Sequence, residues 1–129
     1  PTLAATAPAT ETVAAVAAAL HVDGECSLDG DVLNPPSDPE VLCRWGQMIL
    51  GHAYPDGRGL LGRVAGAARV GDRITIDGVA FTVRSIQSIP KEQYDPASGP
   101  ALVTCDITQG YDATGHSLKN LVVSLSPTT

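Results

Sequence analysis

The sequence is poor in basic residues, in aromatic residues and in long apolar runs. Lys and Arg number 8 against 14 Asp and Glu, which gives a net charge of −6 and no basic stripe to follow a phosphate backbone. Aromatic residues make up only 4% of the chain. The most apolar stretch, residues 13–20, is alanine-rich, too short to cross a bilayer and not preceded by a basic cluster. We therefore expect no nucleic-acid partner and no membrane span.

The three cysteines lack the spacing of a metal site, because no CxxC or HxxxH pattern accompanies them. We therefore predict neither a metal nor another cofactor. An odd count allows at most one disulfide. Cys26 and Cys43 flank a proline-rich segment and can pair, which would leave Cys105 as a thiol. The alternative, with all three reduced, stays open because spacing does not determine connectivity.

The length of 129 residues suits one domain. Residues 1–8 are mostly Ala, Thr and Pro, a composition that cannot form a core, so we predict an extended arm there and a single domain over residues 9–129. Directly after the arm, Val13, Val16 and Leu20 recur at helical spacing and favour a short helix. His21 and His116 lie in alanine-rich or polar surroundings, and we predict both to be solvent-exposed.

Short apolar or alternating runs separated by turn residues predict an all-β fold. The clearest is residues 73–86, in which two alternating stretches flank an Asp77-Gly78 hairpin turn. Further strands are predicted at residues 47–51, 102–105 and 121–125, a loop at 29–39, a turn at 54–57 and a helical turn at 90–94. Roughly seven short strands at such spacing are typical of a small closed antiparallel or mixed β-barrel, here with one or two short helices.

Two reactive residues follow predicted strands. His52 closes the run Met48-Ile49-Leu50-Gly51, and Cys105 ends Ala101-Leu102-Val103-Thr104. A cysteine nucleophile needs a nearby base or cation, and the imidazole that serves it is usually distant in sequence. His52 and Cys105 are therefore the candidate catalytic pair, although lone Cys and His residues at strand ends are more often packing residues.

The motifs around this pair resemble a sortase, most closely class F, the actinobacterial group. In order they are Ile49-Leu50-Gly51-His52, Gly59-Leu60-Leu61-Gly62, Val70-Gly71-Asp72-Arg73-Ile74, Leu102-Val103-Thr104-Cys105, Tyr111-Asp112 and Asn120-Leu121-Val122-Val123. The likeness covers about residues 23–125. It implies a β-barrel transpeptidase that cuts a sorting signal, holds it as an acyl-enzyme and passes it to an amine. It also places a first barrel strand where the spacing before Leu20 favours a helix.

One departure from the sortase pattern concerns catalysis. The family arginine that steadies the substrate and the oxyanion falls by position on Leu118, and no arginine follows Arg84. Lys119 is one residue off, and such a shift on a strand turns the side chain to the opposite face. An ammonium group also cannot reproduce the planar guanidinium fork. Lys119 is therefore a doubtful substitute for the arginine.

Two functions remain, and we favour the first. It is a non-catalytic sortase-fold binding or structural protein, such as a capsid-decoration or tail component of an actinobacterial virus, located in a virion or outside the cell. Its residues 1–8 would contact neighbouring protein subunits. The alternative is a class F-like cysteine transpeptidase that binds a sorting-signal peptide at a cell surface. The missing arginine and the lack of an anchor segment favour the first function.

Overall fold

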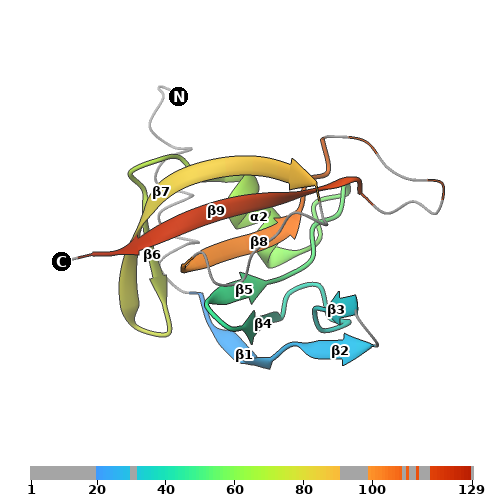
Figure 1. Ribbon diagram of the computed structural model, residues 1–129, viewed down its shortest axis with the longest axis horizontal. Coiled ribbons are helices and arrows are strands. Elements are labelled where there is room, and N and C mark those ends of the chain that lie inside the picture. Colours follow the sequence, from blue (N-terminus) through green and yellow to red (C-terminus); the bar gives the residue numbers. More distant parts are fainter. Residues whose placement is uncertain are drawn as a thin grey trace.

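The computed structural model describes residues 20–29, 32–90, 99–108, 110, 113 and 117–128 (Figure 1). The predicted arm at residues 1–8, the helix predicted before Leu20, the helical turn predicted after Pro90 and the position of His116 lie outside the described residues. The described part is mostly β, as predicted. It contains one helix, α2 (Leu60–Ala67), which is not long enough to cross a membrane.

Seven strands form one mixed sheet. In spatial order they are β1 (Val22–Glu25), β4 (Leu42–Trp45), β5 (Met48–Leu50), β8 (Ala101–Cys105), β9 (Lys119–Pro127), β7 (Val79–Pro90) and β6 (Arg73–Ile76). The pairs β1·β4 and β5·β8 are parallel, and the other pairs are antiparallel. The strands predicted at residues 47–51, 102–105 and 121–125 are therefore confirmed, with shifted ends.

The β6–β7 hairpin is confirmed at the predicted turn. Asp77 and Gly78 have φ angles of 48° and 84°, the left-handed conformations that a two-residue type I′ turn requires. Strand β7 then continues to Pro90, four residues beyond the predicted end at Ile86, and pairs with β9 along most of its length. The β7–β9 pairing is the longest ladder of the curled sheet.

Two elements differ from the sequence prediction. The predicted loop at residues 29–39 contains strand β3 (Val32–Asn34), which pairs with β2 (Ser27–Asp29) in a separate hairpin. Each of these strands has only three residues, too few for an alternating pattern to mark them in the sequence. Helix α2 was not predicted, because two of its eight residues, Gly62 and Gly66, are poor helix formers.

The two faces of the sheet bury different clusters. Helix α2 covers the inner face of the curl, where Ile49, Leu102 and Val123 pack with Leu61 and Val64. Because successive strand residues point to opposite faces, Leu50, Val103 and Val122 belong to a second cluster on the other face. The second cluster includes the buried disulfide between Cys26 and Cys43, which confirms the pairing that the sequence left open.

The sheet is a half-barrel, and the predicted closed barrel is not shown. Its two edge strands, β1 and β6, meet through Leu20, the residue two before β1, which forms a parallel bridge with Ile76. The amide of Leu20 donates to Thr75 O at 3.2 Å, and the amide of Asp77 donates to Leu20 O at 3.0 Å. His21 Nδ1 lies 2.6 Å from Asp77 Oδ1, a contact that raises the pKa of the exposed His21 imidazole. These contacts hold the edges together at one point.

Candidate functional site

Strands β5 and β8 bring His52 and Cys105 to the same end of the sheet. The two strands are parallel and in register, with Leu50 opposite Val103. Their arrowheads point to the same side of the molecule in Figure 1. His52 follows Leu50 by two residues, as Cys105 follows Val103, so both candidate residues lie just beyond the same end of this strand pair. Both side chains are partly exposed, and Cys105 is outside the disulfide.

A buried hydrogen bond fixes this arrangement one residue before the pair. Thr104 Oγ1 donates to Gly51 O at 2.7 Å, across the gap between β8 and β5. Thr104 is 3% exposed, so this bond is shielded from water. It joins the dipeptide Gly51-His52 to the dipeptide Thr104-Cys105. The residues that directly precede His52 and Cys105 are therefore joined to each other.

Gly51 is required by packing. A Cβ at this position would lie 2.7 Å from Leu42 Cδ2 and 2.7 Å from Leu61 Cβ, closer than real Cβ contacts. The backbone before His52 therefore lies directly against the core and against α2. Any side chain at residue 51 would push the end of β5 away from the helix, and His52 would move with it.

The first turn of helix α2 contacts the His52 backbone directly. The amide of Gly62 donates to His52 O at 3.2 Å. A Cβ on Gly59 would lie 2.2 Å from that same oxygen, and a Cβ on Gly62 would lie 2.4 Å from Ala53 Cβ. The two glycines thus allow the start of the helix to touch residues His52 and Ala53. This contact explains the Gly59-Leu60-Leu61-Gly62 motif in physical terms.

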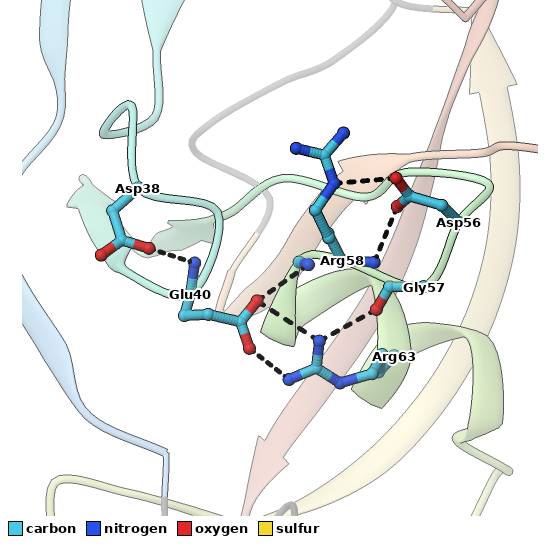
Figure 2. A network of polar contacts seen from close by, with 7 residues as sticks. Asp38, Glu40, Asp56, Gly57, Arg58 and Arg63 are labelled. Carbon is cyan, nitrogen blue, oxygen red and sulfur yellow. Dashed lines mark hydrogen bonds and ion pairs between the residues drawn. The ribbon is translucent and has the colours of Figure 1, made fainter.

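The start of α2 is in turn fixed by Glu40, in the loop before β4 (Figure 2). Its carboxylate accepts a hydrogen bond from the Gly59 amide at 2.8 Å and forms an ion pair with the guanidinium of Arg63. Arg63 also donates to Gly57 O at 3.0 Å. The hydrogen bond from Arg63, and then that from Gly59, hold the pKa of Glu40 below its ordinary value. The network connects the loop before β4 to the helix that contacts His52.

The loop after His52 forms a stack of side chains that sequence reasoning missed. The rings of His52 and Tyr54 are stacked, with centroids 5.6 Å apart and planes 27° apart. The guanidinium carbon of Arg58 lies 4.4 Å from the Tyr54 centroid. Arg58 Nε also donates to Asp56 Oδ2 at 2.8 Å. The turn predicted at residues 54–57 is confirmed by the hydrogen bond from the Gly57 amide to Tyr54 O at 3.0 Å.

Strand β9, the second neighbour of β8 in the sheet, places Asn120 opposite Cys105. The β8–β9 register pairs Cys105 with Asn120 and continues to Asp106, whose amide donates to Lys119 O at 2.9 Å. Alternation puts Asn120 on the Cys105 face and Lys119 on the other. Leu118, on which the predicted resemblance would place the sortase arginine, is 50% exposed. The register thus brings Asn120, and not Lys119, next to Cys105.

Asp106 lies with Lys119 on that other face. Its carboxylate accepts hydrogen bonds from Thr108 N at 3.0 Å and Thr108 Oγ1 at 2.7 Å. Burial would raise the pKa of Asp106, but the Ser88 hydroxyl, Thr108 and the charge of Lys119 outweigh it and lower the pKa. The Ser88 hydroxyl is close enough to act on the carboxylate, although it makes no hydrogen bond of normal geometry. The Asp106 carboxylate is thus held by Thr108, away from the thiol.

A cavity of about 200 Å³ lies away from this site. It is lined by residues at the other ends of the strands, among them Gln47, Asp77 and Pro100. Neither His52 nor Cys105 borders it. Among the described residues, no group of three or more His, Cys, Asp or Glu is placed to hold a metal ion.

Comparisons with protein-family models, curated proteins and solved structures find no significant match to this chain. The resemblance to sortases therefore stays a prediction from the sequence.

Proposed function

We propose that this chain is a sortase-like domain that binds a peptide at the His52–Cys105 end and has lost efficient transpeptidation. The observation that carries the proposal is the in-register pairing of β5 and β8, which delivers both residues to one end of the sheet. Two dipeptides separated by 51 intervening residues meet there through the bond from Thr104 to Gly51. A cysteine and a histidine in this relation fit acyl transfer better than metal binding.

The chemistry of such a site is fixed by the residues present. The Cys105 thiolate would attack a peptide carbonyl carbon, and the carbonyl electron pair would move to oxygen to form an oxyanion. When that intermediate collapses, the peptide C–N bond breaks, and His52 would give its proton to the leaving amine. The product is a thioester on Cys105, which an incoming amine can attack to form a new amide and restore the thiol.

We propose that transpeptidation is inefficient because of the residues at the start of β9. Leu118, at the position of the sortase arginine, has no hydrogen-bond donor in its side chain, and alternation turns Lys119 away from Cys105. Removing one oxyanion donor costs about 100- to 1000-fold in rate. A domain with this defect suits binding or assembly better than turnover.

An extracellular or virion location is part of the same proposal. The disulfide between Cys26 and Cys43 supports it, because disulfides form and persist in oxidising surroundings. We keep the prediction that residues 1–8 contact a neighbouring subunit. Solution scattering of the full chain and of residues 9–129 alone checks it: the full chain should assemble and the shortened one should not. Equal assembly of both would contradict it.

The test of the function is a cleavage and ligation assay. The native chain, Cys105→Ala, Leu118→Arg and Leu118→Lys are incubated with a library of LPxTG-like peptides and an amine acceptor, and products are identified by mass. We expect near-background product from the native chain and product from Leu118→Arg that exceeds that of Leu118→Lys, because only a guanidinium offers the planar fork.

Two outcomes would contradict the proposal. Robust product from the native chain that disappears in Cys105→Ala would show a fully active enzyme. No product from Leu118→Arg, together with no detectable binding of any peptide by the native chain, would remove the sortase-like assignment itself.

A further inference from the structure

Asn120 is placed as the closest cross-strand neighbour of Cys105. Backbone hydrogen bonds join Asp106 to Lys119 and Pro100 to Leu125, at the two ends of the β8–β9 ladder. Because hydrogen-bonded and non-hydrogen-bonded pairs alternate, Cys105 and Asn120 form a non-hydrogen-bonded pair. In such pairs the Cα atoms are only about 4.5 Å apart and the side chains lie on the same face. The carboxamide of Asn120 is therefore within reach of groups attached to the Cys105 sulfur.

The Asn120 side chain is not engaged elsewhere in the described part of the chain. It is half-buried, and none of the side-chain hydrogen bonds found among the described residues involves its carboxamide. A carboxamide offers two N–H donors, and asparagine side chains are among the groups that stabilise oxyanions in acyl transfer. An unpartnered donor beside a nucleophile is the arrangement that such stabilisation needs.

We propose that Asn120 is a catalytic residue whose side-chain N–H donates to the oxyanion formed when Cys105 attacks a carbonyl. The inference rests on the proposed function and deepens it, because it assigns the residual acyl transfer of this site to a donor on β9. Leu118 has no donor to offer. Alternation along β9 turns Lys119 to the opposite face, and Arg58 is held by Tyr54 and Asp56. Asn120 is thus the donor that the register supplies.

The test uses two probes that react with the same sulfur through different transition states. With p-nitrophenyl acetate, the thiolate attacks the ester carbonyl, an oxyanion forms, the ester C–O bond breaks and p-nitrophenolate leaves an acetyl thioester on Cys105. With iodoacetamide, the sulfur displaces iodide from a saturated carbon, and no oxyanion forms. A donor to the oxyanion accelerates only the first reaction.

Four proteins are compared: the native chain, Asn120→Ala, Asn120→Asp and Ser124→Ala. Ser124 is the matched control, because it lies on the same strand and face but opposite Ala101. We expect acetylation of Cys105 to fall by about 10- to 100-fold in Asn120→Ala, toward the loss seen for removed oxyanion donors, and further in Asn120→Asp, whose carboxylate repels the oxyanion. Alkylation should stay within about twofold in Asn120→Ala, and Ser124→Ala should match the native chain in both reactions.

The results distinguish a failure of the role proposed for Asn120 from a failure of the proposed function. Equal losses of acetylation and alkylation in Asn120→Ala would show a general effect on the thiol and overturn the inference, as would unchanged acetylation. Acetylation of the native chain that persists undiminished in Cys105→Ala would instead show that Cys105 is not the nucleophile, and the proposed function would fall with it.

Discussion

The absence of a Cβ atom at three glycines allows close packing around the backbone of His52. Gly51, Gly59 and Gly62 each lie where a Cβ would collide with a neighbour, and all three surround the His52–Ala53 backbone. Gly66 lies in the same helix and has nothing within 4 Å of an added Cβ. These four positions allow the packing role of glycine to be separated from its helix propensity.

We expect Gly62→Ala to lower the free energy of unfolding by about 1–3 kcal/mol, because the added methyl group overlaps Ala53. Gly66→Ala should raise it by about 0.5–1 kcal/mol, since alanine is the better helix former and the site is open. Urea unfolding of the two variants and the native chain measures both effects. An equal gain from both substitutions would contradict the close contact between α2 and residues 52–53.

The elements of the site were only partly predictable. The apolar runs before His52 and Cys105 marked two strand ends, and both strands are found. Their pairing in parallel depends on long-range packing that no local pattern encodes. The hydrogen bond from Thr104 to Gly51 and the position of Asn120 opposite Cys105 follow from register, which the sequence does not display. Helix α2 was missed because Gly62 and Gly66 lower the helix propensity from which helices are predicted.

The Glu40–Arg63 pair, which fixes the start of α2, makes this connection dependent on pH. The pKa of Glu40 is lowered from its ordinary value of 4.5, chiefly by Arg63. A carboxylate with a lowered pKa contributes stability that is fully present above 4.5 and is lost as the pH falls through the lowered value. We expect the native chain to be more stable than Glu40→Gln at pH 7, with the difference shrinking below pH 4.5.

A double-mutant cycle with Arg63→Gln and Glu40→Gln, measured by urea unfolding at several pH values, isolates the pair. The coupling between the two substitutions should be present at neutral pH and fade under acid conditions. A coupling that stays constant down to the acid limit, or is absent at neutral pH, would show that the ion pair does not hold the start of the helix.

At the scale of the whole molecule, three connections outside the ladders join parts of the sheet in the described residues. Its edges meet through Leu20 and the His21–Asp77 contact, and the segment after β1 is tied to β4 by the Cys26–Cys43 disulfide. The sequence allowed this disulfide without requiring it. It predicted a closed barrel because alternation and strand number are the same for a barrel and a curled sheet, while closure depends on how far the edge strands pair.

We expect removal of the disulfide, in the double variant Cys26→Ala/Cys43→Ala, to lower the free energy of unfolding by about 2–4 kcal/mol. The two cysteines are 17 residues apart, so the bond restricts a sizeable loop of the unfolded chain. Cys105→Ala is the control for the loss of a sulfur outside the disulfide. Thermal unfolding of the three proteins measures the effect, and equal stability of the double variant and the native chain would contradict it.

The central claim is that the fold brings residues 52 and 105 together, and disulfide trapping tests it most directly. Residues side by side on neighbouring strands lie about 4.7–4.9 Å apart, within the Cα separation of about 4.4–6.8 Å that a disulfide needs. His52→Cys and the control Arg58→Cys, in the same loop but exposed, are oxidised mildly and then alkylated with iodoacetamide. We predict that His52→Cys loses both alkylatable thiols through a bond to Cys105, while Arg58→Cys keeps both. If both thiols of oxidised His52→Cys remained alkylatable, the two residues would not share a site.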